Sequence, residues 1–79
     1  MTADYSPARR RTIMRTLADV TPRPEWATLD ENSRITYVVG MLVCSLIGFV
    51  AKNDLEAACA DPSAVNYARQ LLRRAGDRK

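Results

Sequence analysis

The segment from Ile35 to Ala51 (ITYVVGMLVCSLIGFVA) constrains the fold most, because it contains no charged side chain. Arg34 and Lys52 border it. As one helix, the segment rises about 25 Å, somewhat less than the roughly 30 Å hydrocarbon core of a bilayer. A helix that is apolar on every side must be buried on every side. The segment is therefore either the central helix of a small bundle or a short membrane span.

Two flanking segments favour the bundle, because each carries an apolar stripe at helical spacing. Residues 7–20 carry Ile13, Met14, Leu17 and Val20, and residues 62–75 carry Val65, Ala68, Leu71, Leu72 and Ala75. Without a central helix these stripes would have nothing to cover. We therefore expect an all-α fold, a small bundle of three to four helices around a central apolar helix at about residues 30–52. The alternative is a single-pass protein of the inner membrane that spans the bilayer with residues 35–51.

Proline and capping residues divide the chain into segments. Ser6-Pro7 and Asp61-Pro62 are typical helix starts, because each places a capping side chain before a proline. The prolines within residues 21–26 predict a stiff elbow, and Gly76 is a typical end signal. Together these signals predict a single domain over residues 1–79, with helices at about 7–20, 30–52, 54–60 and 62–75.

Small residues line one side of the expected central helix. Gly40, Cys44 and Gly48 recur one helical turn apart, and this spacing lets a second helix approach to backbone contact. Two short helices and an elbow can hardly enclose a helix that is apolar on both faces, and small domains often gain stability by self-association. We therefore expect a homodimer that forms through these three residues. The alternative is that the chain's own first helix occupies this side.

The composition argues against catalysis and against metal binding. There is no histidine, and Cys44 and Cys59 cannot complete a tetrahedral metal site by themselves. The acidic pairs Asp30-Glu31 and Asp54-Glu56 lie at expected helix starts, where carboxylates are favourable for the helix alone. We expect no catalytic residue, metal or cofactor. Two cysteines are too few for a secreted disulfide framework, so we expect a reducing, cytoplasmic location.

Arginine carries the remaining signal, since it supplies most of the twelve basic residues in a chain of net charge +3. One cluster comprises Arg9, Arg10, Arg11 and Arg15, and the other comprises Arg69, Arg73, Arg74, Arg78 and Lys79. A planar guanidinium group binds a carboxylate or a phosphate through two hydrogen bonds. The candidate partner-binding residues are therefore Arg9, Arg10, Arg11, Arg15, Arg69, Arg73 and Arg74, together with Trp26. The alternatives are solvated arginine faces, and a tryptophan that covers one end of the core.

These observations favour a small, non-catalytic, helical protein-binding module. Small modules of this kind are often regulators or inhibitors, including those encoded by phages and other mobile elements. Such a protein would bind a larger partner with an acidic surface and block the partner's own ligand. An alternative from another class is a nucleic-acid-contacting accessory protein that uses the same arginines without sequence specificity.

Overall fold

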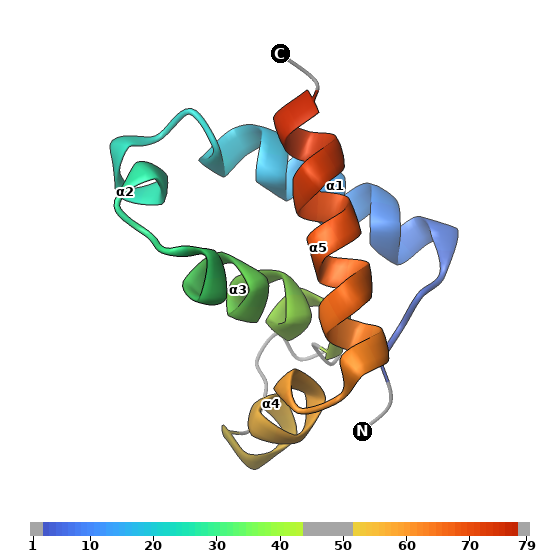
Figure 1. The fold of residues 1–79 in the computed structure, drawn as a ribbon. Helices are drawn as coiled ribbons and strands as arrows, with labels where there is room; N and C mark the ends of the chain where they lie inside the picture. Colours follow the sequence, from blue (N-terminus) through green and yellow to red (C-terminus); the bar gives the residue numbers. More distant parts are fainter. Residues whose placement is uncertain (1–2, 44–51, 78–79) are drawn as a thin grey trace.

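The computed structural model of the protein describes residues 3–43 and 52–77. Within these residues the chain forms five helices and no strand (Figure 1): α1 (Pro7–Val20), α2 (Pro24–Ala27), α3 (Glu31–Val43), α4 (Lys52–Cys59) and α5 (Pro62–Asp77). The expected all-α fold is confirmed. Helices α3 and α5 are both central, because each contacts α1 and α4 and they contact each other.

Side-chain caps explain where three of these helices begin. The Ser6 hydroxyl oxygen accepts a hydrogen bond from the Arg9 backbone N–H at 3.2 Å, directly before α1. The Asp30 carboxylate accepts one from the Ser33 N–H at 2.8 Å before α3, and Asp61 accepts one from the Ser63 N–H at 3.0 Å before α5. Each bond satisfies a backbone donor that has no partner inside its helix.

The cap at Asp30 predicts a pH-dependent contribution to stability. Hydrogen bonding by the Ser33 side chain, and next by its backbone N–H, lowers the pKa of the Asp30 carboxyl below its ordinary value of 3.8. Because the lower pKa belongs to the folded state, the stabilisation is fully present above the unfolded pKa and is lost as pH falls through the folded pKa. We therefore expect Asp30→Ala to lower the melting temperature near pH 6, and to lower it by less once the pH falls below the folded pKa of Asp30.

Asp30→Asn is the matched control for this experiment, because asparagine caps a helix as well as aspartate does but carries no charge. Its melting temperature near pH 6 should lie between those of Asp30→Ala and wild type, because the cap is kept and the charge is lost, and it should not show the acid-dependent step. Thermal unfolding followed by circular dichroism across this pH range measures all three proteins. A constant difference between Asp30→Ala and wild type at every pH would contradict a role for the carboxylate charge.

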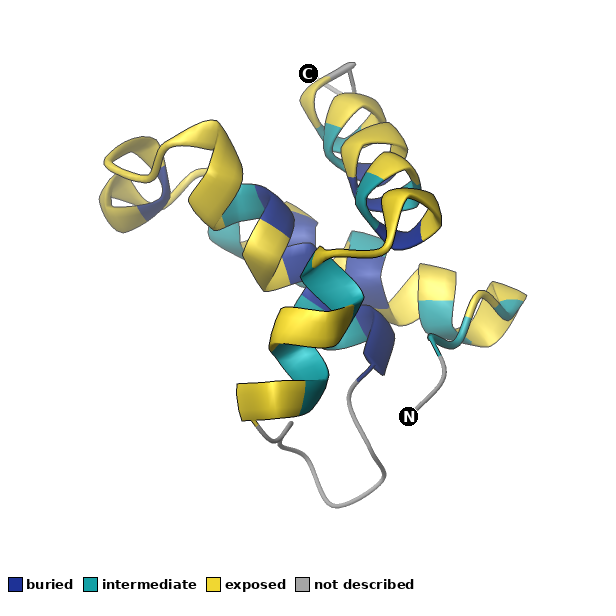
Figure 2. Cartoon of the chain, turned by 60° about the horizontal axis from the view of Figure 1, so that its bottom comes forward, coloured by how far each residue is buried: buried dark blue, intermediate teal, exposed yellow. Residues whose placement is uncertain are grey.

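The core lies where α1, α3 and α5 face one another, and it is the dark region of Figure 2. Its buried side chains are Ile13 and Leu17 from α1, Ile35, Val38, Val39 and Leu42 from α3, and Ala68 and Leu71 from α5. The apolar stripes expected for the first and last helices therefore cover α3.

Helix α5 continues to Asp77, so Gly76 lies inside the last helix rather than ending it.

The expected central helix at about residues 30–52 is described only in part, as α3 from Glu31 to Val43, because residues 44–51 lie outside the described residues. Helix α4 follows from Lys52 and lies against α3 (Figure 1). The Leu55 Cδ1 atom of α4 is 3.7 Å from the position that a Cβ atom on Gly40 would occupy.

None of the helices within the described residues has both the length and the apolar character needed to cross a membrane.

Candidate functional site

A half-open groove of about 970 Å³ lies between α1 and α5, and it is closed at one end by α2 and the start of α3. Its apolar lining includes Met14, Ala18, Trp26, Leu72 and Ala75. Its charged lining consists of Glu31, Arg34, Arg69 and Arg73. Three guanidinium groups thus face a single carboxylate. Ligand-binding sites often combine apolar walls with a few convergent charged groups, so this groove is the candidate site.

The elbow carries Trp26 into this groove. Pro24 begins the short helix α2, and Trp26 follows within its first turn. The indole is only 9% exposed and belongs to the core cluster, as expected for a tryptophan that covers one end of the core. It packs edge-to-face against Tyr37, with ring centroids 5.6 Å apart and planes at 75°. This geometry is favourable for aromatic pairs, so the core holds Trp26 in place.

Arg34 completes this end of the groove, and sequence reasoning did not include it among the candidate residues. Its Nη2 donates a hydrogen bond to the Trp26 carbonyl oxygen at 2.9 Å, and its guanidinium carbon lies 5.4 Å from the centroid of the indole ring. Its Nε is buried and has no hydrogen-bond partner within the described residues. Arg34 also lines the groove, so a carboxylate bound there would lie beside a guanidinium group that is already held in place.

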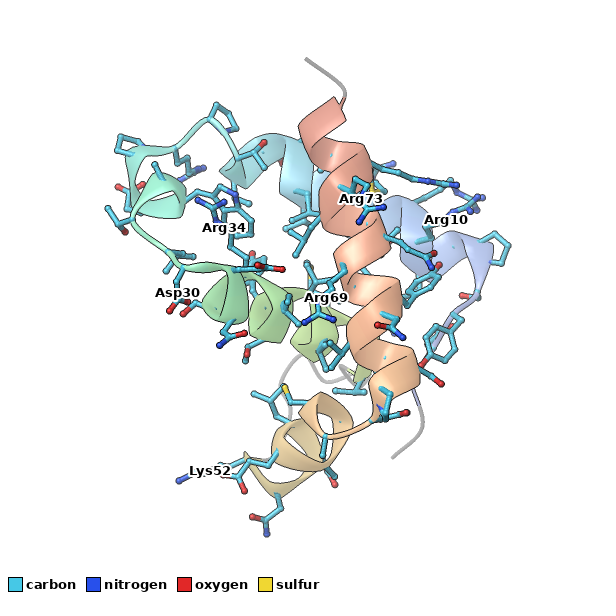
Figure 3. All side chains as sticks on the ribbon, viewed as in Figure 1. Arg10, Asp30, Arg34, Lys52, Arg69 and Arg73 are labelled. Atoms are coloured by element: carbon cyan, nitrogen blue, oxygen red, sulfur yellow. The ribbon has the colours of Figure 1, made fainter. Side chains whose placement is uncertain are left out.

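Arg69 and Arg73 form the opposite side of the groove. They lie one turn apart on α5, and both are exposed. Figure 3 shows both side chains on the visible side of α5, with Arg34 beyond them toward α2. Arg69 Nε is 3.7 Å from the Glu31 carboxylate, but both side chains are at least half exposed. An exposed ion pair of this kind is weak, so an acidic ligand can compete with Glu31 for Arg69.

The N-terminal arginine cluster does not join this groove. Arg9 is held within the fold, because its Nη1 donates to the Met41 carbonyl oxygen at 2.8 Å and its Nε lies 3.5 Å from the Asp4 carboxylate. The other members, Arg10, Arg11 and Arg15, are exposed on α1 and are not part of the groove lining. In Figure 3, Arg10 lies across α5 from Arg34.

Within the C-terminal arginine cluster, Arg69 and Arg73 line the groove. Arg74 is exposed on α5 but does not line the groove, and Arg78 and Lys79 lie outside the described residues. Of the candidate partner-binding residues, the structure therefore brings together three: Arg69, Arg73 and Trp26.

The expected small-residue contact is only partly described. Gly40 is half-buried, and its neighbour is Leu55 of α4 rather than the first helix. Cys44 and Gly48 lie outside the described residues. The homodimer through these three residues therefore stays a prediction.

Within residues 3–43 and 52–77, no three side chains of the metal-binding types come together. No protein family, curated protein or solved structure matches this chain. The groove between α1 and α5 is therefore the basis for a functional proposal, because it combines apolar lining with arginines from two helices.

Proposed function

We propose that the protein is a small helical binding module that holds an acidic segment of a larger protein in the groove between α1 and α5. One observation carries the proposal: Arg34, Arg69 and Arg73 meet over an apolar lining that contains a single carboxylate, Glu31. Guanidinium groups bind carboxylates through paired, charge-assisted hydrogen bonds. The apolar lining supplies the buried surface that a stable complex also needs.

The mechanism is steric. A segment held in the groove is covered by α1 and α5 and is no longer accessible to its other ligands. The protein would therefore regulate or inhibit its partner by occlusion, without any chemical step. The net charge of +3 favours encounter with an acidic surface, and this long-range attraction weakens as salt rises.

Charge reversal at Arg69 and Arg73 tests the proposal. We expect Arg69→Glu with Arg73→Glu to weaken partner binding at least tenfold, because two attractive contacts become repulsive. Both side chains are exposed, so helicity measured by circular dichroism should stay unchanged. Native affinity capture from the source cells, followed by mass spectrometry, identifies the proteins that wild type retains and the double variant loses.

Arg11→Glu with Arg15→Glu is the matched control, because these exposed arginines are also one turn apart but lie outside the groove lining. This control should capture the same proteins as wild type. Equal capture by the Arg69 and Arg73 double variant would refute the groove as the binding site. The control variant could instead lose a nucleic acid that wild type binds with an affinity that falls steeply with salt. That result would support the alternative function, a nucleic-acid-contacting accessory protein.

A further inference from the structure

We infer that the occupant of the groove is an amphipathic α-helix, and that Arg34 anchors one of its carboxylates while Arg69 and Arg73 receive the carboxylates beside it. This inference rests on the proposed function and specifies the form of the partner segment. It depends on three observations: the walls of the groove, the state of the Arg34 side chain, and the spacing of the arginines on α5.

The walls favour a helical occupant over an extended one. They are formed by side chains of helices, and the described residues offer no strand edge that could pair with an extended peptide. An extended backbone would therefore leave its N–H and C=O groups against apolar side chains without partners. A helix satisfies these groups internally, with only its side chains reaching the walls.

The shape of the lining also suits a helix. Met14 and Ala18 are one turn apart on α1, and Leu72, Ala75 and Gly76 lie within one turn on α5. Each wall therefore presents one large apolar side chain followed by small residues. Small residues let the axis of an incoming helix approach closely, and the large side chains pack between its ridges.

Arg34 supplies the most specific site for a carboxylate. Its guanidinium group is already oriented, by the hydrogen bond to the Trp26 carbonyl and by the indole ring. Its buried Nε donor still has no partner within the described residues. Because Arg34 lines the groove, a ligand carboxylate would meet a charged group whose conformation changes little on binding, which favours affinity.

The arginines on α5 set the spacing of the ligand's acids. Arg69 and Arg73 are four residues apart, so they rise about 6 Å along α5. Glutamates four residues apart on an adjacent helix have the same rise. A second copy of this chain fits less well, because it would bring its own excess of arginine toward a groove that already carries three.

A designed peptide tests the inference directly. The probe is a helix of about 15 residues without tryptophan, with leucine on one stripe and three glutamates beside it, two of which are four residues apart. Trp26 is the single tryptophan of the protein and lines the groove, so its fluorescence reports binding there. We expect a saturable change in Trp26 emission, with a gain of peptide helicity seen by circular dichroism.

Two control peptides separate the parts of the inference. Replacing all three glutamates by glutamine should weaken binding at least tenfold, and a central proline, which breaks the helix, should abolish it. Equal binding of the glutamine peptide would overturn the carboxylate contacts. Equal binding of the proline peptide would overturn the helical form, and stronger binding of inorganic phosphate or of a DNA duplex would overturn the identity of the occupant.

Protein variants test the named arginines. Arg34→Gln and Arg73→Gln should each weaken binding of the glutamate peptide about fivefold or more. Neither variant should change binding of the glutamine peptide. Arg11→Gln should bind both peptides with the affinity of the wild-type protein. Arg73 is exposed, so its variant keeps the test valid even if Arg34→Gln disturbs folding. If the peptides fail to bind while partner capture still depends on Arg69 and Arg73, this inference is wrong and the proposed function stands.

Discussion

Replacing Leu42 by alanine is expected to lower the free energy of unfolding by about 2–5 kcal/mol. The Leu42 side chain is fully buried in the core that α3 shares with α1 and α5. Its removal loses apolar burial and leaves a cavity that the surrounding helices fill only partly. A chain of 79 residues has a total stability of about 4–12 kcal/mol, so this loss is a large fraction of the whole.

Leu29→Ala is the matched control, because it makes the same chemical change at a side chain that is 37% exposed. Its effect should stay within about 0.5 kcal/mol, as for most surface substitutions. Urea unfolding followed by circular dichroism gives both values on one scale. If both variants lose a similar amount of unfolding free energy, water reaches the position of Leu42. That result would contradict the described core.

The parts of the fold that were predictable from sequence are those fixed by local signals. Residues 7–20 were expected as a helix, and α1 has these bounds because Ser6 caps it and Pro7 occupies its first position. The start of the last helix at Pro62 was predictable for the same reason. Apolar spacing identified Ile13, Leu17, Ala68 and Leu71 as core residues, because a stripe on one face of a helix has to be buried.

The position of α4 within the fold was not predictable in the same way. The contact of Leu55 with Gly40 joins residues of two different helices. Periodicity describes the faces of a single helix and does not say which other helix covers each face. A helix at about residues 54–60 was predicted, close to α4, but for this reason its position against α3 could not be read from the spacing of Gly40 and its neighbours.

In the candidate site, too, some residues were identified from the sequence and the role of others depends on the fold. Arg69, Arg73 and Trp26 were identifiable as an arginine pair on one helix face and a lone tryptophan. Arg34 was missed because, in the sequence, it only marks the border of the apolar segment. Its role depends on the elbow, which returns the chain so that Arg34 reaches the Trp26 carbonyl. Arg9 was assigned to a binding cluster, but its contact with the Met41 carbonyl joins parts of the chain that only folding brings together.

Trp26→Ala is expected to produce the second large effect, a loss of about 3–5 kcal/mol in the free energy of unfolding. The indole is 9% exposed, packs edge-to-face on Tyr37 and contacts the Arg34 guanidinium group. Its removal opens the core at the elbow and leaves Arg34 without the ring that helps to orient it. At about 4–8 °C per kcal/mol for a chain of this size, the melting temperature should fall by at least about 12 °C.

Tyr5→Ala is the matched control, because Tyr5 also forms an edge-to-face pair, with Tyr67 at 5.0 Å, but is 43% exposed. It loses a similar aromatic contact with much less burial, so its melting temperature should fall by a smaller amount. Thermal unfolding followed by circular dichroism compares the two variants. If Trp26→Ala is no more destabilising than Tyr5→Ala, the indole does not close the core. Its place in the groove would then reflect ligand contact alone, since only a ligand would gain from the ring at that position.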